Sequence, residues 1–394
     1  MSDLKSKQRV YKPVMKKKPV CIILTLLIAA GTSYPQTIHL KGLVTSWLAG
    51  SAKKAVQPFI GLRYIPSFSI EHPFDKGYSL DAEFSLNAYG NLNFHSVKDV
   101  ESDGDIKPYR MWVRFSTKRF EARLGLQKIN FGSAYMFRPL MWFDRLDPRD
   151  PLMLTDGVYG LLLRYYFLNN ANIWLWGLYG NNDTKGWEFI ANSRKTAEFG
   201  GRAQIPAGKG ELGFSFHQRT IDISETLQEI GLADEQDIPE NRFAVDGKWD
   251  IGIGIWFEGA VFKQKSSWIT NPWQQMLTLG ADYTFGIGNG LNVVGEHFIF
   301  GQSSEFLSSG ESLEFSAVML NYPLGLLDSI SGIVYYDWEN HDFYRFINWQ
   351  RTYDRWQIYV MGFWNPEEFL IYQTNTDSSL FTGTGFQIMV VYNY

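Results

Sequence analysis

The sequence predicts an all-β fold, a closed antiparallel transmembrane β-barrel of about 18 strands, with about 16 as the alternative. Three observations predict this class. The chain begins with an export-type apolar segment, it is rich in aromatic residues and glycine without long apolar runs, and polar and apolar residues alternate along much of its length. Each feature is typical of a barrel that carries lipid on one face and water on the other.

The N-terminal segment has the layout of a secretory signal peptide. Lys16, Lys17 and Lys18 precede the apolar run PVCIILTLLIAAG, which ends in small residues. This run is too short for a transmembrane helix, which needs about 20 residues. We therefore assign residues 1–36 to a signal peptide, with Met15 as an alternative start, and residues 37–394 to the barrel.

Cysteine usage and charge exclude several classes. Cys21 lies inside the signal segment, so the exported chain has no disulfide and no thiolate metal site. Removing residues 1–36 removes seven of the 37 Lys and Arg and one of the 41 Asp and Glu, which leaves a net charge of about −10. This charge argues against a nucleic-acid partner.

The composition suits strands better than helices. The chain has 14 Trp, 21 Tyr and 36 Gly, and its slightly negative mean hydropathy does not fit a helical membrane protein. Strands with one apolar and one polar face average to neutral hydropathy while keeping one apolar wall.

The period-2 pattern sets the expected strands and connections. In RFEARLGLQ, for example, Arg119, Glu121 and Arg123 share one face, while Phe120 and Leu124 share the other. The expected strands are 38–49, 56–67, 78–95, 109–117, 119–130, 157–168, 171–181, 197–206, 209–221, 242–252, 253–265, 274–287, 289–302, 312–323, 327–339, 343–352, 355–364 and 380–394. Short turns alternate with long connections at 96–108, 131–157, 182–196, 222–241, 302–311 and 365–379. This alternation predicts short periplasmic turns, long external loops and both termini inside.

The last strand carries the clearest single pattern. Phe386, Ile388, Val390, Tyr392 and Tyr394 alternate up to the final residue. The pattern resembles the C-terminal signal of outer-membrane barrels, and it implies recognition by the barrel-assembly machinery. We therefore expect the chain in the cell outer membrane, in contact with outer-membrane lipid and lipopolysaccharide.

The inward faces show a bias in charge sign. The first half of the barrel contributes Arg110, Arg114, Arg123, Arg164, Arg202 and Arg219, and the second half contributes Asp246, Glu258, Asp282 and Glu296. If the strands run in order, an arginine-rich wall faces an acidic wall and filters solutes by charge. The alternative is that these charges pair across strands and only keep the lumen wet.

The segment 131–157 combines apolar bulk with charge. An inward fold would cover the side chains of AYMFRPLMWFDRL and narrow the lumen. The constriction would then carry Arg138, Asp144, Arg145, Asp147 and Asp150. The alternative is a surface lid or an adhesive patch for another protein.

The same region resembles porin-like outer-membrane families of the alginate-export and carbohydrate-porin type. In these families a strand of the form R-x-G-x-Q-x-I-x-(W/F)-G leads into a loop with Pro and Asp-Pro. The matching positions are Arg123, Gly125, Gln127, Ile129, Phe131, Gly132, Pro139, Asp147 and Pro148. Phe131 stands where Trp is more usual, and the chain is shorter than typical alginate exporters. A polysaccharide substrate is implied by this resemblance alone.

Enzymatic and metal sites find little support. The six histidines are scattered without H-x-S or H-E-x-x-H spacing, so we expect no enzyme, no cofactor and no metal. Asp99, Glu101, Asp103 and Asp105 alternate in the expected 96–108 loop, but no bidentate Glu completes a calcium loop. We interpret them as a solvated acidic loop or a lipopolysaccharide-bridging cation site.

Two functions from different classes follow. The first is an outer-membrane channel for passive diffusion of small hydrophilic or anionic solutes, with loop 131–157 narrowing the lumen. The second is an occluded barrel that acts as a structural or secretion-associated partner and docks through loops 131–157 and 182–196. The sequence leaves open whether the chain forms a homo-oligomer, as many porins do.

Overall fold

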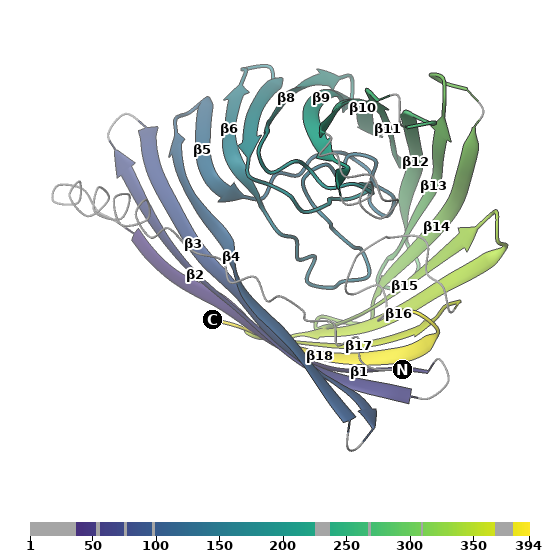
Figure 1. Cartoon of the computed structure of the whole chain (residues 1–394). Coiled ribbons are helices and arrows are strands. Elements are labelled where there is room, and N and C mark those ends of the chain that lie inside the picture. The colour runs from purple at the N-terminus through teal and green to yellow at the C-terminus, as the bar shows by residue number, and fades with distance from the viewer. Residues whose placement is uncertain are drawn as a thin grey trace, which may run out of the picture.

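The chain forms one closed antiparallel sheet of 18 strands. The computed structural model describes residues 37–52, 56–74, 77–96, 99–224, 237–266, 269–308, 310–366 and 381–394. Each strand pairs with its sequence neighbour, and β1 pairs with both β2 and β18, so the sheet closes on itself. Figure 1 shows the strands enclosing the space that the loops enter.

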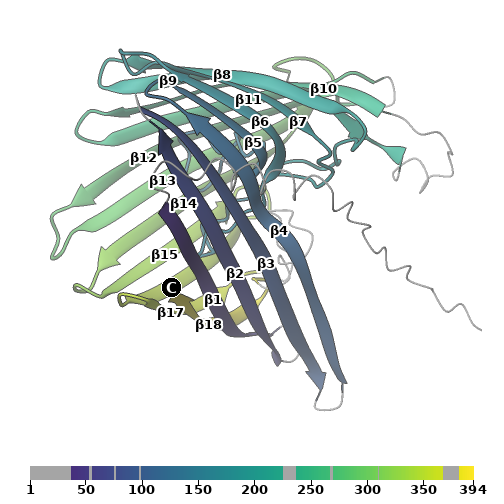
Figure 2. The ribbon, with the colours of Figure 1, turned by 90° about the vertical axis from the view of Figure 1, so that its left-hand side faces the viewer.

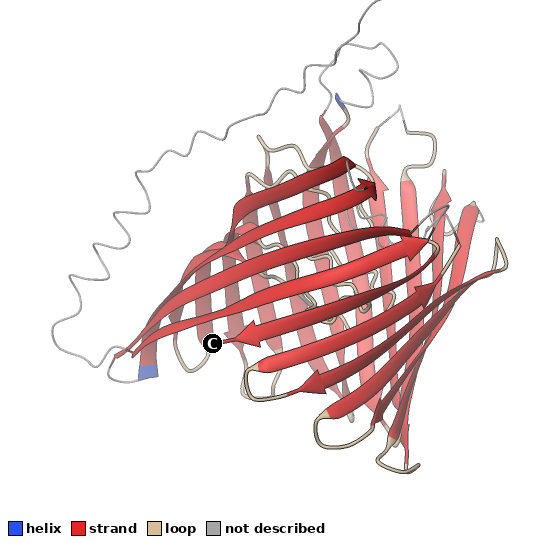
Figure 3. Cartoon of the chain, turned by 90° about the horizontal axis from the view of Figure 1, so that it is seen from below, coloured by secondary structure: helices blue, strands red, loops and turns tan. Residues whose placement is uncertain are grey.

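The strands differ widely in length. Their bounds are β1 (Thr37–Ala52), β2 (Val56–Phe74), β3 (Tyr78–Ser96), β4 (Asp99–Ser116), β5 (Phe120–Gln127), β6 (Val158–Tyr166), β7 (Asn172–Tyr179), β8 (Ala197–Ala207), β9 (Gly210–Asp222), β10 (Asp237–Asp250), β11 (Gly254–Gln264), β12 (Trp273–Phe285), β13 (Leu291–Ser303), β14 (Glu311–Pro323), β15 (Asp328–Asp337), β16 (Asp342–Thr352), β17 (Trp356–Trp364) and β18 (Thr384–Asn393). The strands are tilted relative to the barrel axis (Figure 3), as closure of a barrel requires.

The strand count confirms 18 over 16, because the weakly patterned region 343–364 forms two separate strands, β16 and β17. The signal-peptide assignment for residues 1–36 lies outside the described residues, as does most of the expected loop 365–379.

The expected long connection at 96–108 is wrong. Strands β3 and β4 continue through it, and their ladder extends to the pair Ser96 and Asp99. Asp99, Glu101, Asp103 and Asp105 therefore lie on a strand and not in a loop. Their alternation with Val100, Ser102, Gly104 and Ile106 is itself a strand pattern. In Figure 2, β2, β3 and β4 form a tall strip that runs past the neighbouring strands.

The outward face is apolar around the barrel. Exposed outward side chains include Leu62 on β2, Leu124 on β5, Leu175 on β7, Leu279 on β12 and Val318 on β14. Such a continuous apolar wall suits lipid, and a closed sheet satisfies every strand backbone group internally. The fold is that of a transmembrane barrel of the cell outer membrane.

Among the described residues, no helix is long and apolar enough to cross a membrane.

At the seam, β18 pairs with β1 from Thr384 to Asn393. Phe386 and Ile388 are exposed on the outward side, and Met389 and Val391 are buried on the inward side. Four of the five alternating residues thus lie on β18, and Tyr394 follows it, with backbone hydrogen bonds to Gly42 of β1. Their role as an assembly signal stays a prediction.

A charge placed on the outward wall should destabilise the barrel. Leu279→Arg puts a guanidinium at the middle of β12 on the lipid side, and we expect a loss of about 2–4 kcal/mol in the free energy of unfolding. Denaturant titration of the barrel in lipid bilayers measures this loss. Ile287→Arg in the β12–β13 turn is the matched control and should change little. An equal effect of the two substitutions would contradict the assignment of the outward wall.

Candidate functional site: the inner loop and the lumen

The connection between β5 and β6 folds into the barrel, as its aromatic content predicted (Figure 1). Ile129, Met136, Phe137 and Trp142 are almost completely buried. They join one apolar cluster with inward side chains of β6, β7 and β10 to β16. We call residues 128–157 the inner loop.

Ring contacts attach the inner loop to the far wall. The Phe137 ring stacks on Phe298 of β13 at 5.3 Å between centroids and meets Tyr335 of β15 edge-on at 5.5 Å. Nearer to β5, Phe131 stacks on Trp176 of β7 at 5.7 Å. Aromatic pairs in these geometries stabilise beyond their buried area. The loop thus packs as a small core inside the barrel.

Two carboxylates of the wall hold the loop backbone. Glu296 on β13 accepts hydrogen bonds from the amides of Tyr135, Met136 and Phe137 at 2.6, 2.8 and 2.7 Å. Glu258 on β11 accepts from the amides of Ala134 and Leu140 at 2.6 and 3.2 Å.

A glycine allows this approach. Gly132 has a φ of +104°, and a Cβ there would meet Oε1 of Glu258 at 2.2 Å. Charge-assisted bonds of this kind are among the stronger hydrogen bonds in proteins. Glu258 and Glu296, expected to line the lumen, therefore anchor the loop.

A second connection, residues 181–196, covers the inner loop. Trp187 donates its indole N–H to the carbonyl of Arg138 at 3.0 Å and stacks on Phe298 at 4.6 Å. Glu188 forms ion pairs with Arg242 at 2.6 Å and Arg219 at 3.0 Å. Sequence patterning did not single out Trp187, Glu188 or Arg242, because their roles depend on contacts between distant segments.

Several charges expected to line the lumen are paired across strands. Arg202 binds Asp246 through two hydrogen bonds of 2.5 and 2.8 Å, and Arg219 binds Glu240 at 2.6 Å. All four side chains are buried. Asp282 lies on β12 beside Gly254 of β11.

The remaining expected arginines gather on β4, β5 and β6. Arg114 and Arg123 are direct cross-strand partners, and Glu121 lies 2.9 Å from Arg123 and 3.9 Å from Arg164. Arg114 pairs with Asp81 of β3 at 2.7 Å. We call Arg110, Arg114, Arg123 and Arg164 the arginine cluster.

Two tryptophan rings pack against guanidiniums of the arginine cluster. The Arg164 guanidinium lies 3.9 Å from the Trp174 ring, and that of Arg123 lies 4.8 Å from the Trp112 ring. Arg110 is buried and donates to the carbonyl of Thr155 at 3.0 Å, which ties the end of the inner loop to β4. Arg114, with its side chain 32% exposed, is the most open of the three arginines paired with carboxylates.

The charges of the inner loop mostly shape the loop itself. Arg138 pairs with Asp144 at 3.1 Å, and burial raises the pKa of Asp144 although Arg138 opposes the shift. Asp150 accepts from the amides of Leu152 and Leu154 at 2.9 and 3.2 Å. Burial also raises the pKa of Asp150, against the effect of these amides.

The tip of the loop docks on a third part of the wall. The Arg149 guanidinium binds Asp147 and lies 4.8 Å from the ring of Phe381. Arg145 donates to the carbonyl of Thr184 in the second connection. Leu152 packs beside buried Tyr359 of β17 and Met389 of β18. The inner loop therefore contacts the wall from β5 across β11–β15 to β18 and back to β4.

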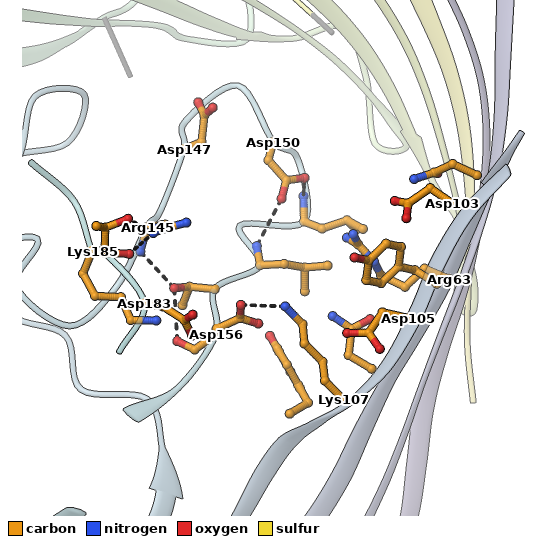
Figure 4. Close-up of a pocket in the computed structure, with 18 of the residues that line it drawn as sticks. Arg63, Asp103, Asp105, Lys107, Arg145, Asp147, Asp150, Asp156, Asp183 and Lys185 are labelled. Atoms are coloured by element: carbon orange, nitrogen blue, oxygen red, sulfur yellow. Dashed lines mark hydrogen bonds and ion pairs between the residues drawn. The ribbon is translucent and has the colours of Figure 1, made fainter. Parts of the chain in front are cut away.

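A cavity of about 1250 Å³ lies between these two loops and strands β1–β4. Its wall side is lined by Trp47, Arg63, Asn87, Tyr89, Asp103, Asp105 and Lys107, and its loop side by Arg145, Asp147, Asp150, Asp156, Asp183 and Lys185. Figure 4 shows Arg63, Asp103 and Asp105 together on the wall, opposite Arg145, Asp183 and Lys185.

A β-bulge brings the β4 side chains into this cavity. The ladder with β3 shifts between Ser85 and Leu86, opposite Tyr109. In β4, odd-numbered residues before Tyr109, such as Asp105 and Lys107, therefore face inward, and even-numbered residues after it, such as Arg110 and Arg114, face inward. Lys107 then reaches Asp156 of the inner loop at 2.7 Å. Burial opposes ionisation of Asp156, but the hydrogen bond and charge of Lys107, together with the charges of Lys185 and Arg145, leave its pKa below the usual value.

The wall residues could have been found from alternation. Phe59, Gly61 and Arg63 share one face of β2, and Ile60 and Leu62 share the other, both exposed outward. The alternation places Arg63 on the inward face, but it is the single charged residue among residues 59–63, so the charge pattern did not mark it.

Comparisons with known proteins agree on the fold. No protein-family model and no curated protein matches the sequence. Among solved structures, OccAB1 of Acinetobacter baumannii is similar over 91% of this chain and 96% of its own, with 10% identity and a TM-score of 0.54. An anion-selective porin from Comamonas acidovorans is similar over 91% of this chain and 100% of its own, with 13% identity and a TM-score of 0.49.

The chain has the porin-like outer-membrane barrel fold. The alginate-export or carbohydrate-porin subtype stays a prediction from the sequence. At these identities it concerns the fold alone, so what the neighbours transport is not transferred to this barrel.

One serine–histidine contact lies outside the lumen. His297 Nδ1 is 3.0 Å from Ser316 Oγ, on the outward side of β13 and β14. Trp338 also donates to Ser316 Oγ, at 2.9 Å. In the described part of the chain, no group of three or more His, Cys, Asp or Glu side chains could hold a metal ion.

The carboxylate anchors predict that one substitution releases the loop. Glu296→Gln weakens three amide contacts that each contribute about 1.5–3 kcal/mol when the acceptor is charged. We expect faster hydrogen exchange at the amides of Tyr135, Met136 and Phe137, measured by mass spectrometry. Glu314→Gln on the outward side of β14 is the control. Unchanged protection of these three amides in Glu296→Gln would contradict the anchoring role of Glu296.

Proposed function

We propose that the protein is an outer-membrane channel for passive diffusion of small hydrophilic or anionic solutes. The observation that carries this proposal is the large polar cavity between the inner loop and strands β1–β4. A polar passage inside an apolar barrel allows solutes to leave bulk water without crossing lipid. The inner loop, which fills the opposite side of the barrel, would narrow the passage to this one wall.

The arginine cluster supports selectivity for anions. Four guanidiniums on adjacent strands share few carboxylates, since both Arg123 and Arg164 approach the same Glu121. A partly exposed cluster of fixed positive charge raises the local concentration of anions. Asp246, Glu258 and Glu296 are engaged elsewhere, so the acidic side would consist of loop carboxylates that line the cavity, such as Asp183 and the Arg149-bound Asp147.

The alternative role as an occluded docking partner has less support. Its proposed docking loops bury Phe137, Trp142 and most of Trp187 inside the barrel. Aromatic side chains that pack on the inner wall are not presented to another protein. Contacts with lipopolysaccharide, recognition by the assembly machinery and homo-oligomerisation are further proposals that follow from the barrel class.

Ion selectivity tests the channel. We expect steady conductance of the refolded chain in a planar bilayer and a reversal potential in a salt gradient that indicates anion preference. Replacing Arg114 and Arg123 together by Ala should shift the reversal potential toward cation preference, because two fixed charges are lost. Lys209→Ala in the β8–β9 turn is the control. A barrel that is silent at all voltages would overturn the proposal, and deletion of residues 134–152 with loss of a co-purifying protein would then favour the docking role.

A further inference from the structure

Three neighbouring strands place a cation, a ring and a carboxylate in one row. Arg63 of β2 is the cross-strand partner of Tyr89 on β3, and Tyr89 is the partner of Asp105 on β4. All three side chains line the cavity. With strands about 4.8 Å apart, the Cα atoms of Arg63 and Asp105 are separated by about 10 Å. The row therefore presents opposite charges at its two ends.

The cation of this row is positioned but not neutralised. The Arg63 guanidinium lies 5.5 Å from the Trp47 ring and 5.6 Å from the Tyr89 ring. No carboxylate among the described residues forms an ion pair with it, and its Nε is buried without a hydrogen-bond partner. A guanidinium held by rings keeps its planar donors available for a carboxylate.

The acidic end is similarly available. Asp105 accepts a hydrogen bond from the adjacent amide of Ile106 at 2.7 Å, and neither Asp103 nor Asp105 forms an ion pair with a described residue. Among the described residues, no group of three or more His, Cys, Asp or Glu side chains that could hold a metal ion includes Asp103 or Asp105. These acids are better suited to an ammonium group.

Two buried polar groups point independently to a ligand. Thr45 is 1% exposed and Asn87 is 5% exposed, and both line the cavity. Oγ1 of Thr45 and Oδ1 of Asn87 have no hydrogen-bond partner in the described chain. Buried polar groups are normally satisfied, because leaving them unpaired costs free energy.

We propose that this row is a binding site for a short zwitterionic peptide of two or three residues. The proposal rests on the channel function and names a solute class for it. The peptide carboxylate pairs with Arg63, its ammonium group pairs with Asp105, and its backbone crosses the Tyr89 ring beside Asn87. An extended chain advances about 3.3–3.6 Å per residue, so two or three residues match the spacing of the row.

Capped peptides test both ends separately. The probes are triglycine, N-acetyl-triglycine, triglycine amide and the doubly capped peptide, with affinity measured from blockade of single-channel current and by titration calorimetry of the detergent-solubilised barrel. We expect each single cap to weaken binding about tenfold, as for loss of one charge-assisted contact.

Matched variants assign the ends. Arg63→Gln should remove discrimination against the amide only, and Asp105→Asn should remove discrimination against the acetylated peptide only. Lys209→Gln and Asp354→Asn, in turns outside the cavity, should keep the full pattern.

The outcomes separate this site from the channel itself. Equal affinity for all four peptides with normal conductance would overturn the peptide site and leave the channel standing. A silent barrel that still discriminates the caps by calorimetry would support the site and overturn diffusion through it. A silent barrel without discrimination would overturn both.

Discussion

The interior of this barrel depends on two wall carboxylates that hold loop backbone. Glu258 and Glu296 together accept five amide hydrogen bonds from residues 134–140. Backbone amides that are buried away from water need hydrogen-bond acceptors, and the β-strands hold these two carboxylates at fixed positions. Because the amides are satisfied there, the aromatic side chains of the loop can pack on the inner wall. Loop position, cavity shape and exposure of the arginine cluster all follow from this anchoring.

The anchored loop divides the charges of the lumen into two groups. The first group is buried behind the loops. It consists of the ion pair of Arg202 with Asp246, which joins β8 to β10, and that of Arg219 with Glu240, which joins β9 to β10. On the side of β1–β6, guanidiniums outnumber their close carboxylates and rest on tryptophan rings. Buried pairs contribute little to a solute passing on the other side, whereas partly exposed guanidiniums contribute fixed charge. The path of a solute is thus set by where the loop packs.

Alternation in the sequence predicted the closed barrel, the 18 strands and an inward loop, because a two-faced wall leaves a period of two in every strand. It also assigned Glu258 and Glu296 to the inward face. It could not identify their partners, since the amides of residues 134–140 lie more than a hundred residues away. The run DVESDGDIK was mistaken for a loop because its polarity outweighed its alternation. The bulge at Tyr109, which decides that Asp105 and Lys107 face inward, leaves no distinct composition signal.

The central claim is that solutes pass between the inner loop and strands β1–β4, and cysteine accessibility tests it most directly. The chain has a single cysteine, Cys21, within the assigned signal peptide. Asn87→Cys places a thiol on the proposed path. Thr278→Cys places one on the wall that the inner loop covers, where the Thr278 hydroxyl donates a hydrogen bond to the carbonyl of Phe137. A charged, water-soluble thiol reagent added to open channels should reduce the current through Asn87→Cys and leave Thr278→Cys unchanged. Rapid block through Thr278→Cys with no effect at Asn87→Cys would place the path on the opposite side and contradict the account.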